Sequence, residues 1–183
     1  NSGPVTTFST YSVVSENRLI LLPPKVSKQE AVLFGCAFPT GVGMIFKQID
    51  LKKKHTIAII GIGGVGLFSL IAAKVLNCKK IIAIDNNDFK LSIAKKNGAN
   101  YCINSKKYNI NKAINKITKF QGVDYCIDTA GNIETIEIGF DIINKKTGLC
   151  IFCSHPSFGK KIRLDPFELI SGKKIIGSWG GGV

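Results

Sequence analysis

The sequence predicts an α/β fold in which a doubly wound, six-stranded parallel sheet is covered by helices on both faces. From residue 56 onward, apolar runs typical of strands alternate with helical stretches, and the runs lie at residues 56–60, 80–85, 100–103, 123–128, 148–153 and 174–179. Most of the runs are continuously apolar, as expected for strands buried on both faces. With 183 residues and 45% hydrophobic content, the chain can bury a core of about one domain.

The first predicted strand ends at a glycine-rich turn, GIGGVG at residues 61–66. This G-x-G-x-x-G pattern precedes a helical run and a second strand that ends at Asp85, about 20 residues further on. Gly61 is expected to form the tight turn, Gly63 to let the backbone approach a pyrophosphate, and Gly66 to let helix and strand pack closely. The stretch therefore predicts a βαβ unit that binds a dinucleotide.

The end of the second strand indicates which dinucleotide. Unpaired N–H groups and the positive dipole end of the helix suit the phosphates. Asp85 would accept hydrogen bonds from the adenosine ribose and would repel a 2′-phosphate, and Asn86 and Asn87 bring no arginine to bind one. These features favour NAD over NADP.

This stretch also has features of two other kinds of structure. Residues 56–73 carry no charge and reach the length of a membrane helix. Four glycines and a change of period at Gly61 favour a buried strand, turn and helix instead, so no membrane association is expected. A methyltransferase that binds S-adenosylmethionine also has a glycine-rich first turn and an acidic second-strand end, and it remains open from this stretch alone.

The chain is basic, with a formal net charge of +13. A basic balance can indicate a nucleic-acid partner. Here the basic residues are mostly lysines scattered along the chain, and runs such as Lys52-Lys53-Lys54 are typical of solvated loops. We expect no nucleic-acid binding.

Six cysteines occur without a short disulfide framework or a signal peptide, which predicts a reducing, cytoplasmic setting. Cys150 and Cys153 lie within one predicted strand, where residues three apart point to opposite faces. They are therefore expected to pack in the core and not to chelate a metal.

Before residue 56 the sequence predicts a different kind of structure. Pieces such as YSVV at residues 11–14 look like strands but lack partners, and the chain starts with Asn1 and ends on glycines, so we expect a segment cut at both ends. Ser27 and Glu30 form a capping-box pattern that opens a helix expected to run from about residue 28 to 51, with a break or kink at Pro39.

Five motifs in order resemble the medium-chain, zinc-dependent alcohol dehydrogenase family. They are FSTYSVVSENRL at 8–19, GCAFPTGVG at 35–43, IIGIGGVGL at 59–67, IIAIDNNDFKLSIAKKNGANYCIN at 81–104 and GVDYCIDTAGN at 122–132. The resemblance implies a Rossmann NAD-binding domain at residues 38–183. It implies that residues 1–37 are a truncated piece of a β-rich, GroES-like catalytic domain together with the start of the linking helix.

The resemblance also implies the site residues. Cys36 would be one of three protein ligands of a catalytic zinc, with the other two outside this chain. The residues that would contact NAD are Thr40, Gly61, Gly63, Gly64, Val65, Gly66, Asp85, Lys90, Thr129, Ala130, Cys153, Ser154 and Ser178.

The implied activity is zinc-assisted hydride transfer between a small alcohol, or its aldehyde or ketone, and NAD. The chain alone would supply the coenzyme part and be inactive, and a homodimer or homotetramer would be expected. The alternatives are a zinc-free quinone or enoyl reductase of the same superfamily, or a non-catalytic nucleotide- or nucleic-acid-binding module. In a zinc-free relative, Cys36 would be only a small apolar helix residue.

Overall fold

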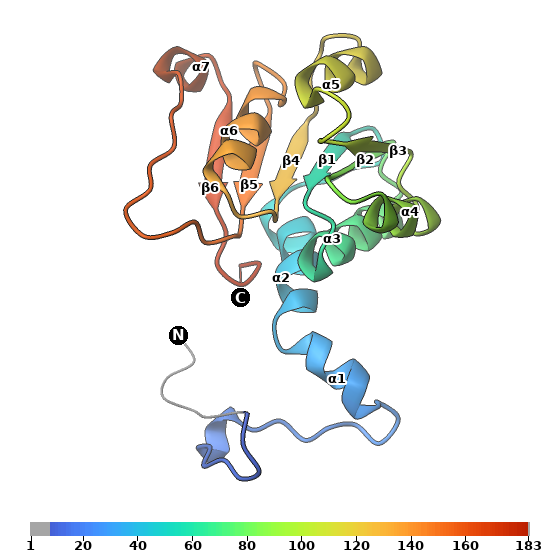
Figure 1. Ribbon diagram of the computed structural model, residues 1–183, viewed down its shortest axis with the longest axis vertical. Coiled ribbons are helices and arrows are strands. Elements are labelled where there is room, and N and C mark those ends of the chain that lie inside the picture. Colours follow the sequence, from blue (N-terminus) through green and yellow to red (C-terminus); the bar gives the residue numbers. More distant parts are fainter. Residues whose placement is uncertain (1–7, 183) are drawn as a thin grey trace.

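A computed structural model of the chain describes residues 8–182. Its elements are η1 (Glu16–Arg18), α1 (Lys28–Phe34), α2 (Ala37–Gly43), η2 (Met44–Gln48), β1 (Thr56–Ile60), α3 (Gly64–Val75), β2 (Lys80–Asp85), α4 (Asp88–Lys96), β3 (Tyr101–Asn104), α5 (Ile110–Thr118), β4 (Tyr125–Asp128), α6 (Ile133–Asp141), β5 (Leu149–Phe152), α7 (Pro166–Ile170) and β6 (Lys174–Gly177). Figure 1 shows the sheet with its helices, and α1 and the segment before it extending away from them.

The six predicted strands all form, and they make one parallel sheet in the order β3-β2-β1-β4-β5-β6. The order reverses between β1 and β4, which is the doubly wound dinucleotide-binding arrangement. The strands are shorter than predicted at some ends: Val123 makes only an isolated bridge to Ile143, and Ser178 lies beyond the end of β6.

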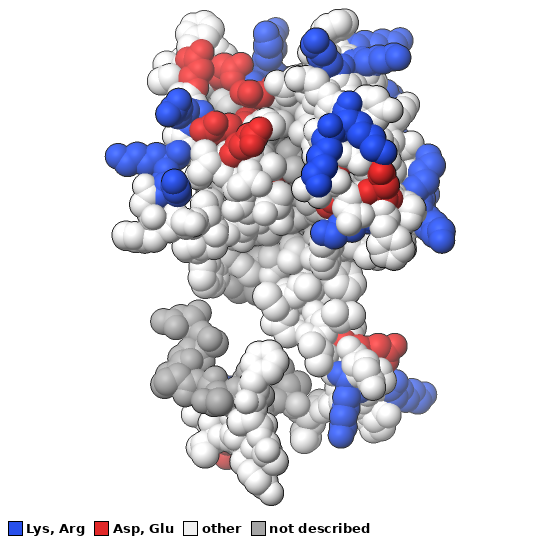
Figure 2. Space-filling model, viewed as in Figure 1, with Lys and Arg blue, Asp and Glu red and all other residues white. Residues whose placement is uncertain are grey.

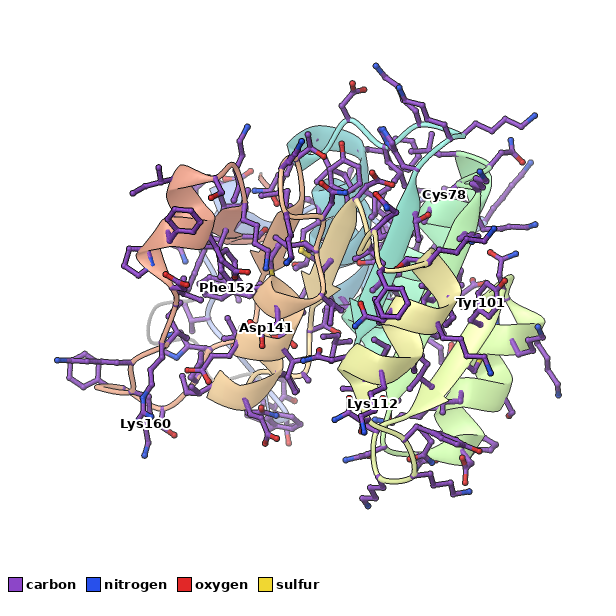
Figure 3. All side chains as sticks on the ribbon, turned by 90° about the horizontal axis from the view of Figure 1, so that it is seen from above. Cys78, Tyr101, Lys112, Asp141, Phe152 and Lys160 are labelled. Carbon is purple, nitrogen blue, oxygen red and sulfur yellow. The ribbon has the colours of Figure 1, made fainter. Side chains whose placement is uncertain are left out.

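Alternate residues of β1 face two separate hydrophobic clusters. Ile57 and Ile59 belong to a cluster with the buried residues of α3 and α4, whereas Ala58 and Ile60 belong to a cluster with those of α5 and α6. Viewed from above in Figure 3, helices lie on both sides of the strands. The sheet is therefore buried on both faces, which explains why its strands read as continuous apolar runs.

The helix predicted for residues 28–51 is interrupted, as expected, but the break lies at Cys36 and not at Pro39. The Ser27–Glu30 capping box forms as predicted, but α1 ends at Phe34 and a second helix starts at Ala37. The break lies at Cys36, whose φ of −149° and ψ of −65° are not helical. Pro39 does not cause it, because Pro39 lies in the first turn of α2, where a missing N–H costs no helical hydrogen bond.

The strand expected near YSVV does not form: within residues 8–27 the structure contains only the short helix η1. A strand needs a hydrogen-bonding neighbour, and among the described residues no strand pairs with this segment. Residues 1–7 and Val183, which the predicted domain ranges include, lie outside the described residues.

Within residues 8–182, no helix taken singly has the length and apolar composition of a membrane span. Residues 28–34 and 37–48, bent by 45° at their junction, pass that test only as a pair.

Candidate functional site

The glycine-rich turn combines three different structural requirements. Gly61 has a φ of +87°, and a Cβ there would lie 2.8 Å from the Ala130 nitrogen. A Cβ on Gly66 would lie 2.0 Å from the Gly61 carbonyl oxygen, so this glycine lets α3 pack on the turn. Gly63 differs from both: its backbone is extended, at φ −90°, and nothing lies within 4 Å of its missing Cβ. Space at Gly63 is therefore left for a molecule that is not part of the chain.

The amino end of α3 faces the same space. The first hydrogen bond of the helical pattern is donated by Leu67 N–H to the Gly63 carbonyl, at 2.9 Å. In the part of the chain that the structure describes, the N–H groups of Gly64, Val65 and Gly66 have no hydrogen-bond acceptor. Unpaired N–H groups at a helix start, with the helix dipole behind them, form a site for phosphate.

Asp85 links the end of β2 to this turn. Its carboxylate is 7% exposed and accepts hydrogen bonds from the N–H groups of Ile62, at 2.7 Å, and Asn87, at 2.9 Å. Each oxygen retains acceptor capacity. Asp85 thus orders the turn as well as lining the cavity beside it, a structural role that the sequence pattern did not reveal.

That cavity has a volume of about 290 Å³ and lies at the carboxyl ends of β1, β2 and β4. It is lined by six of the predicted residues, Gly61, Gly63, Asp85, Lys90, Thr129 and Ala130. A neighbouring cavity of about 420 Å³ shares the residues Asn86, Ser105, Ile110, Asn132 and Thr135 with it. Together they form one groove between the β3–α5 and β4–α6 loops, which we call the adenosine-side groove.

Asp128, at the end of β4, is a functional residue that sequence reasoning did not assign. It is fully buried, and burial raises the pKa of its carboxyl group. It accepts from Ala130 N–H at 3.3 Å and Gly131 N–H at 3.5 Å, which shapes the loop after β4. Thr129 in that loop donates its hydroxyl to the Ile60 carbonyl at 3.1 Å, so the loop is fixed to the end of β1. The sequence signal that could have identified Asp128 is an acidic residue at the end of a predicted strand.

A second cavity, of about 700 Å³, lies at the carboxyl ends of β5 and β6, beside the start of α2. Its lining includes the predicted residues Cys36, Thr40, Val65, Thr129, Cys153, Ser154 and Ser178, together with His155 and Trp179. We call it the α2-side cavity. Thr129 lines both this cavity and the adenosine-side groove. Gly64 and Gly66 are not among the lining residues of either cavity and belong to the first turn of α3.

Ser178 has an unusual environment in the α2-side cavity. The residue is 7% exposed, and among the described residues its buried hydroxyl has no hydrogen-bond partner. Its backbone N–H is bonded to the Phe152 carbonyl at 2.8 Å, which fixes its position. A buried hydroxyl without a partner is costly, and a bound polar group would satisfy it.

The cysteines fall into distinct environments. Cys36 is exposed at the start of α2. Cys153 is half-buried, and burial raises the pKa of its thiol to about 11, so it stays protonated at neutral pH. Cys150 packs in the core with Cys126, in the cluster opposite the one that Cys153 contacts, as its strand position predicted.

Within residues 8–182, no group of three or more His, Cys, Asp or Glu side chains could hold a metal ion. Cys36 has the soft donor atom that zinc prefers, and its exposure leaves it free to bind. The residues present therefore fit one ligand of a zinc site and do not form a complete site.

The strand order, the open space at Gly63, the free helix start and the carboxylate at the second strand end define a Rossmann-type, dinucleotide-binding domain. A model of the family described as zinc-binding dehydrogenase matches residues 64–183. The chain belongs to this family.

Comparisons with known proteins support this family assignment. An S-(hydroxymethyl)glutathione dehydrogenase from Synechocystis is 32% identical over 97% of this chain, and one from Haemophilus influenzae is 31% identical over the same share. The crystal structure of benzyl alcohol dehydrogenase from Acinetobacter calcoaceticus superposes on 97% of the chain with a TM-score of 0.88 and 31% identity. The chain spans about half the length of these relatives, 48%, 47% and 49% respectively.

Proposed function

We propose that this chain is the coenzyme-binding part of an NAD-dependent, zinc-containing alcohol dehydrogenase. The observation that carries the proposal is the position of Gly63 and Asp85 on one cavity: the first leaves room for a pyrophosphate, and the second offers a buried carboxylate to a ribose. Family membership and relatives named for alcohol dehydrogenation support the rest.

The proposed layout assigns each end of NAD to one cavity. Adenosine would occupy the adenosine-side groove, with its ribose at Asp85 and Lys90 and with Thr129 and Ala130 beside it. The pyrophosphate would lie at the start of α3. The nicotinamide would occupy the α2-side cavity, against Thr40, Val65, Cys153, Ser154 and Ser178. Thr40 is 8% exposed, so its side chain is positioned by its surroundings before a ligand binds.

Cys36 would hold zinc together with ligands from outside this chain. When bound, zinc supplies a Lewis acid for the alcohol oxygen, and NAD supplies the hydride acceptor. The protein's contribution is to hold the two ends of the coenzyme in separate cavities, with Cys36 at the edge of the α2-side cavity as the metal ligand. We propose residues 38–183 as the coenzyme domain and residues 1–37 as the end of the catalytic domain.

The alternatives have less support. The matching family is described as zinc-binding, which favours zinc chemistry over a zinc-free reductase. On the face visible in Figure 2, lysine and arginine side chains are spread out with acidic side chains among them, and Lys112 and Lys160 lie far apart in Figure 3, so these views give no support to nucleic-acid binding. We propose a cytoplasmic enzyme acting on a small alcohol or aldehyde.

A homodimer or homotetramer is part of the proposal. Strand β6 is at the open edge of the sheet, and the segment around it exposes large apolar side chains: Phe167 is 72%, Ile170 84% and Trp179 75% exposed. Association with another copy of the chain would cover this open strand edge and the apolar side chains beside it.

The direct test is titration of the purified 183-residue chain with NADH, followed by nicotinamide fluorescence. Saturable binding that ADP-ribose displaces is expected, and S-adenosylmethionine should not compete. Binding of S-adenosylmethionine without binding of NADH would reject the proposal. In the longer protein, Cys36→Ser should abolish alcohol oxidation; unchanged activity would point to a zinc-free reductase.

A further inference from the structure

A second acidic residue lies close to Asp85 in the sequence. Asp88 is the first residue of α4, and its two oxygens accept from two different side chains of the β3 end and the loop after it. Asn104 Nδ2 donates to Oδ1 at 2.7 Å, and Lys107 Nζ donates to Oδ2 at 2.7 Å. The bonds from Lys107 and Asn104 lower the pKa of the Asp88 carboxyl group, so it is ionised at neutral pH.

The loop that carries Lys107 forms one wall of the adenosine-side groove. Ser105 lines both parts of the groove, and its N–H donates to the Asp85 carbonyl at 3.0 Å. Tyr108 lines the outer part, and the N–H groups of Lys107 and Tyr108 are both bonded to the Asn104 carbonyl. Lys107 lies between Ser105 and Tyr108 in this loop, but its own side chain is not among the residues that line the groove and is 59% exposed.

A cation beside the adenosine-side groove affects the choice of coenzyme, because a coenzyme with a 2′-phosphate needs positive charge beside the adenosine ribose. Lys90 already lines the groove. Lys107 is a second cation in the loop beside the groove, and its ammonium group is bonded to Asp88 at 2.7 Å in an exposed ion pair. The ammonium charge is therefore held against a carboxylate that lies three residues after Asp85.

We propose that the Asp88–Lys107 pair is a second determinant of the preference for NAD over NADP, acting beside Asp85. The proposal rests on the proposed binding of a nicotinamide coenzyme at this site. Asp88 acts by holding Lys107: it neutralises the ammonium group and keeps it from binding a 2′-phosphate.

The test uses 5′-AMP and 2′,5′-ADP, two nucleotides that differ only in the 2′-phosphate. Their dissociation constants would be measured by calorimetry for the wild-type chain, Asp88→Asn, Lys107→Met and the double variant. Asp88→Asn should lower the ratio of the constant for 2′,5′-ADP to that for 5′-AMP by about threefold to tenfold, as expected for exposed charges. The double variant should return most of the way to the wild-type ratio, because the released cation is gone.

A matched control is Asp165→Asn, which removes the same charge from the N-cap of α7 at an exposed position that lines neither cavity. Its ratio should not change. An unchanged ratio in Asp88→Asn, or an equal weakening of both nucleotides, would overturn the proposal and leave Asp88 only a loop anchor. The proposal would also be overturned if the double variant showed the same lowered ratio of dissociation constants as Asp88→Asn. If the wild-type chain bound neither nucleotide, the proposed function itself would fail.

Discussion

Gly41 of α2 lies directly against Val65 of α3, and a Cβ on Gly41 would lie 2.4 Å from the Val65 carbonyl oxygen. The contact is reinforced by Ser69, whose buried hydroxyl is 3.0 Å from the Gly41 carbonyl and 3.1 Å from the Val65 carbonyl. The helix that follows Cys36 is therefore packed, backbone to backbone, on the helix that begins at the coenzyme turn. The proposed metal ligand and the proposed pyrophosphate site are held in one rigid arrangement.

Gly41→Ala should destabilise the chain by about 1–3 kcal/mol, because the added methyl group must push α2 away from α3. Chemical denaturation would measure the change. Gly35→Ala is the matched control: its Cβ would meet only the Val32 carbonyl oxygen, at 3.7 Å, and its backbone is helical. Equal stability of the Gly41→Ala and wild-type chains would contradict the close approach.

Gly63→Ala should leave stability unchanged and weaken NADH binding by about tenfold or more. No atom of the chain lies near the added methyl group, so only a bound pyrophosphate would meet it. Thermal unfolding and fluorescence titration separate the two effects. Gly66→Ala should behave in the opposite way and lose stability, because its Cβ would overlap the Gly61 carbonyl. If Gly63→Ala bound NADH normally, the pyrophosphate would have to lie elsewhere.

Asp85→Ser should narrow the preference for NAD over NADP in the longer protein, because the repelling carboxylate is removed. It should also weaken binding of NAD, since serine is too short to replace both acceptors for Ile62 and Asn87. The ratio of kcat/KM for the two coenzymes reports the first effect, and the KM for NAD reports the second. A ratio that does not move would show that Asp85 does not contact the ribose.

The chain should lose stability as the pH rises from about 9 toward 11. Burial raises the pKa of the Cys78 and Cys153 thiols from 9.0 to about 11 in each case. In this window the unfolded thiols give up protons that the folded ones keep, so stability falls with rising pH. Thermal unfolding at several pH values should show a smaller alkaline loss for Cys78→Ala than for the wild-type chain. Identical losses would contradict the raised pKa of Cys78.

The sheet and the glycine turn could be predicted from the sequence, because both depend on local patterns. Apolar runs buried on two faces identify the strands. The spacing of Gly61, Gly63 and Gly66 indicates three separate steric requirements for glycine. The helix break at Cys36 could not be predicted, since no residue type there forbids helix and the obvious candidate, Pro39, is acceptable in a first turn.

Contacts between segments that are distant in the sequence could not be predicted either. Asp85 was visible as an acid at a strand end, but its bond to the Ile62 N–H depends on how β1 and β2 align. The unpartnered hydroxyl of Ser178 is also a property of packing, so the sequence could name the residue and not its environment.

Thr129 lines both the adenosine-side groove and the α2-side cavity, and its hydroxyl fixes the loop between them. A substitution at Thr129 would therefore alter the adenosine-side groove and the α2-side cavity at once. Asp85 and Ser178 each line one cavity, so the two ends of the site can be altered separately at those positions.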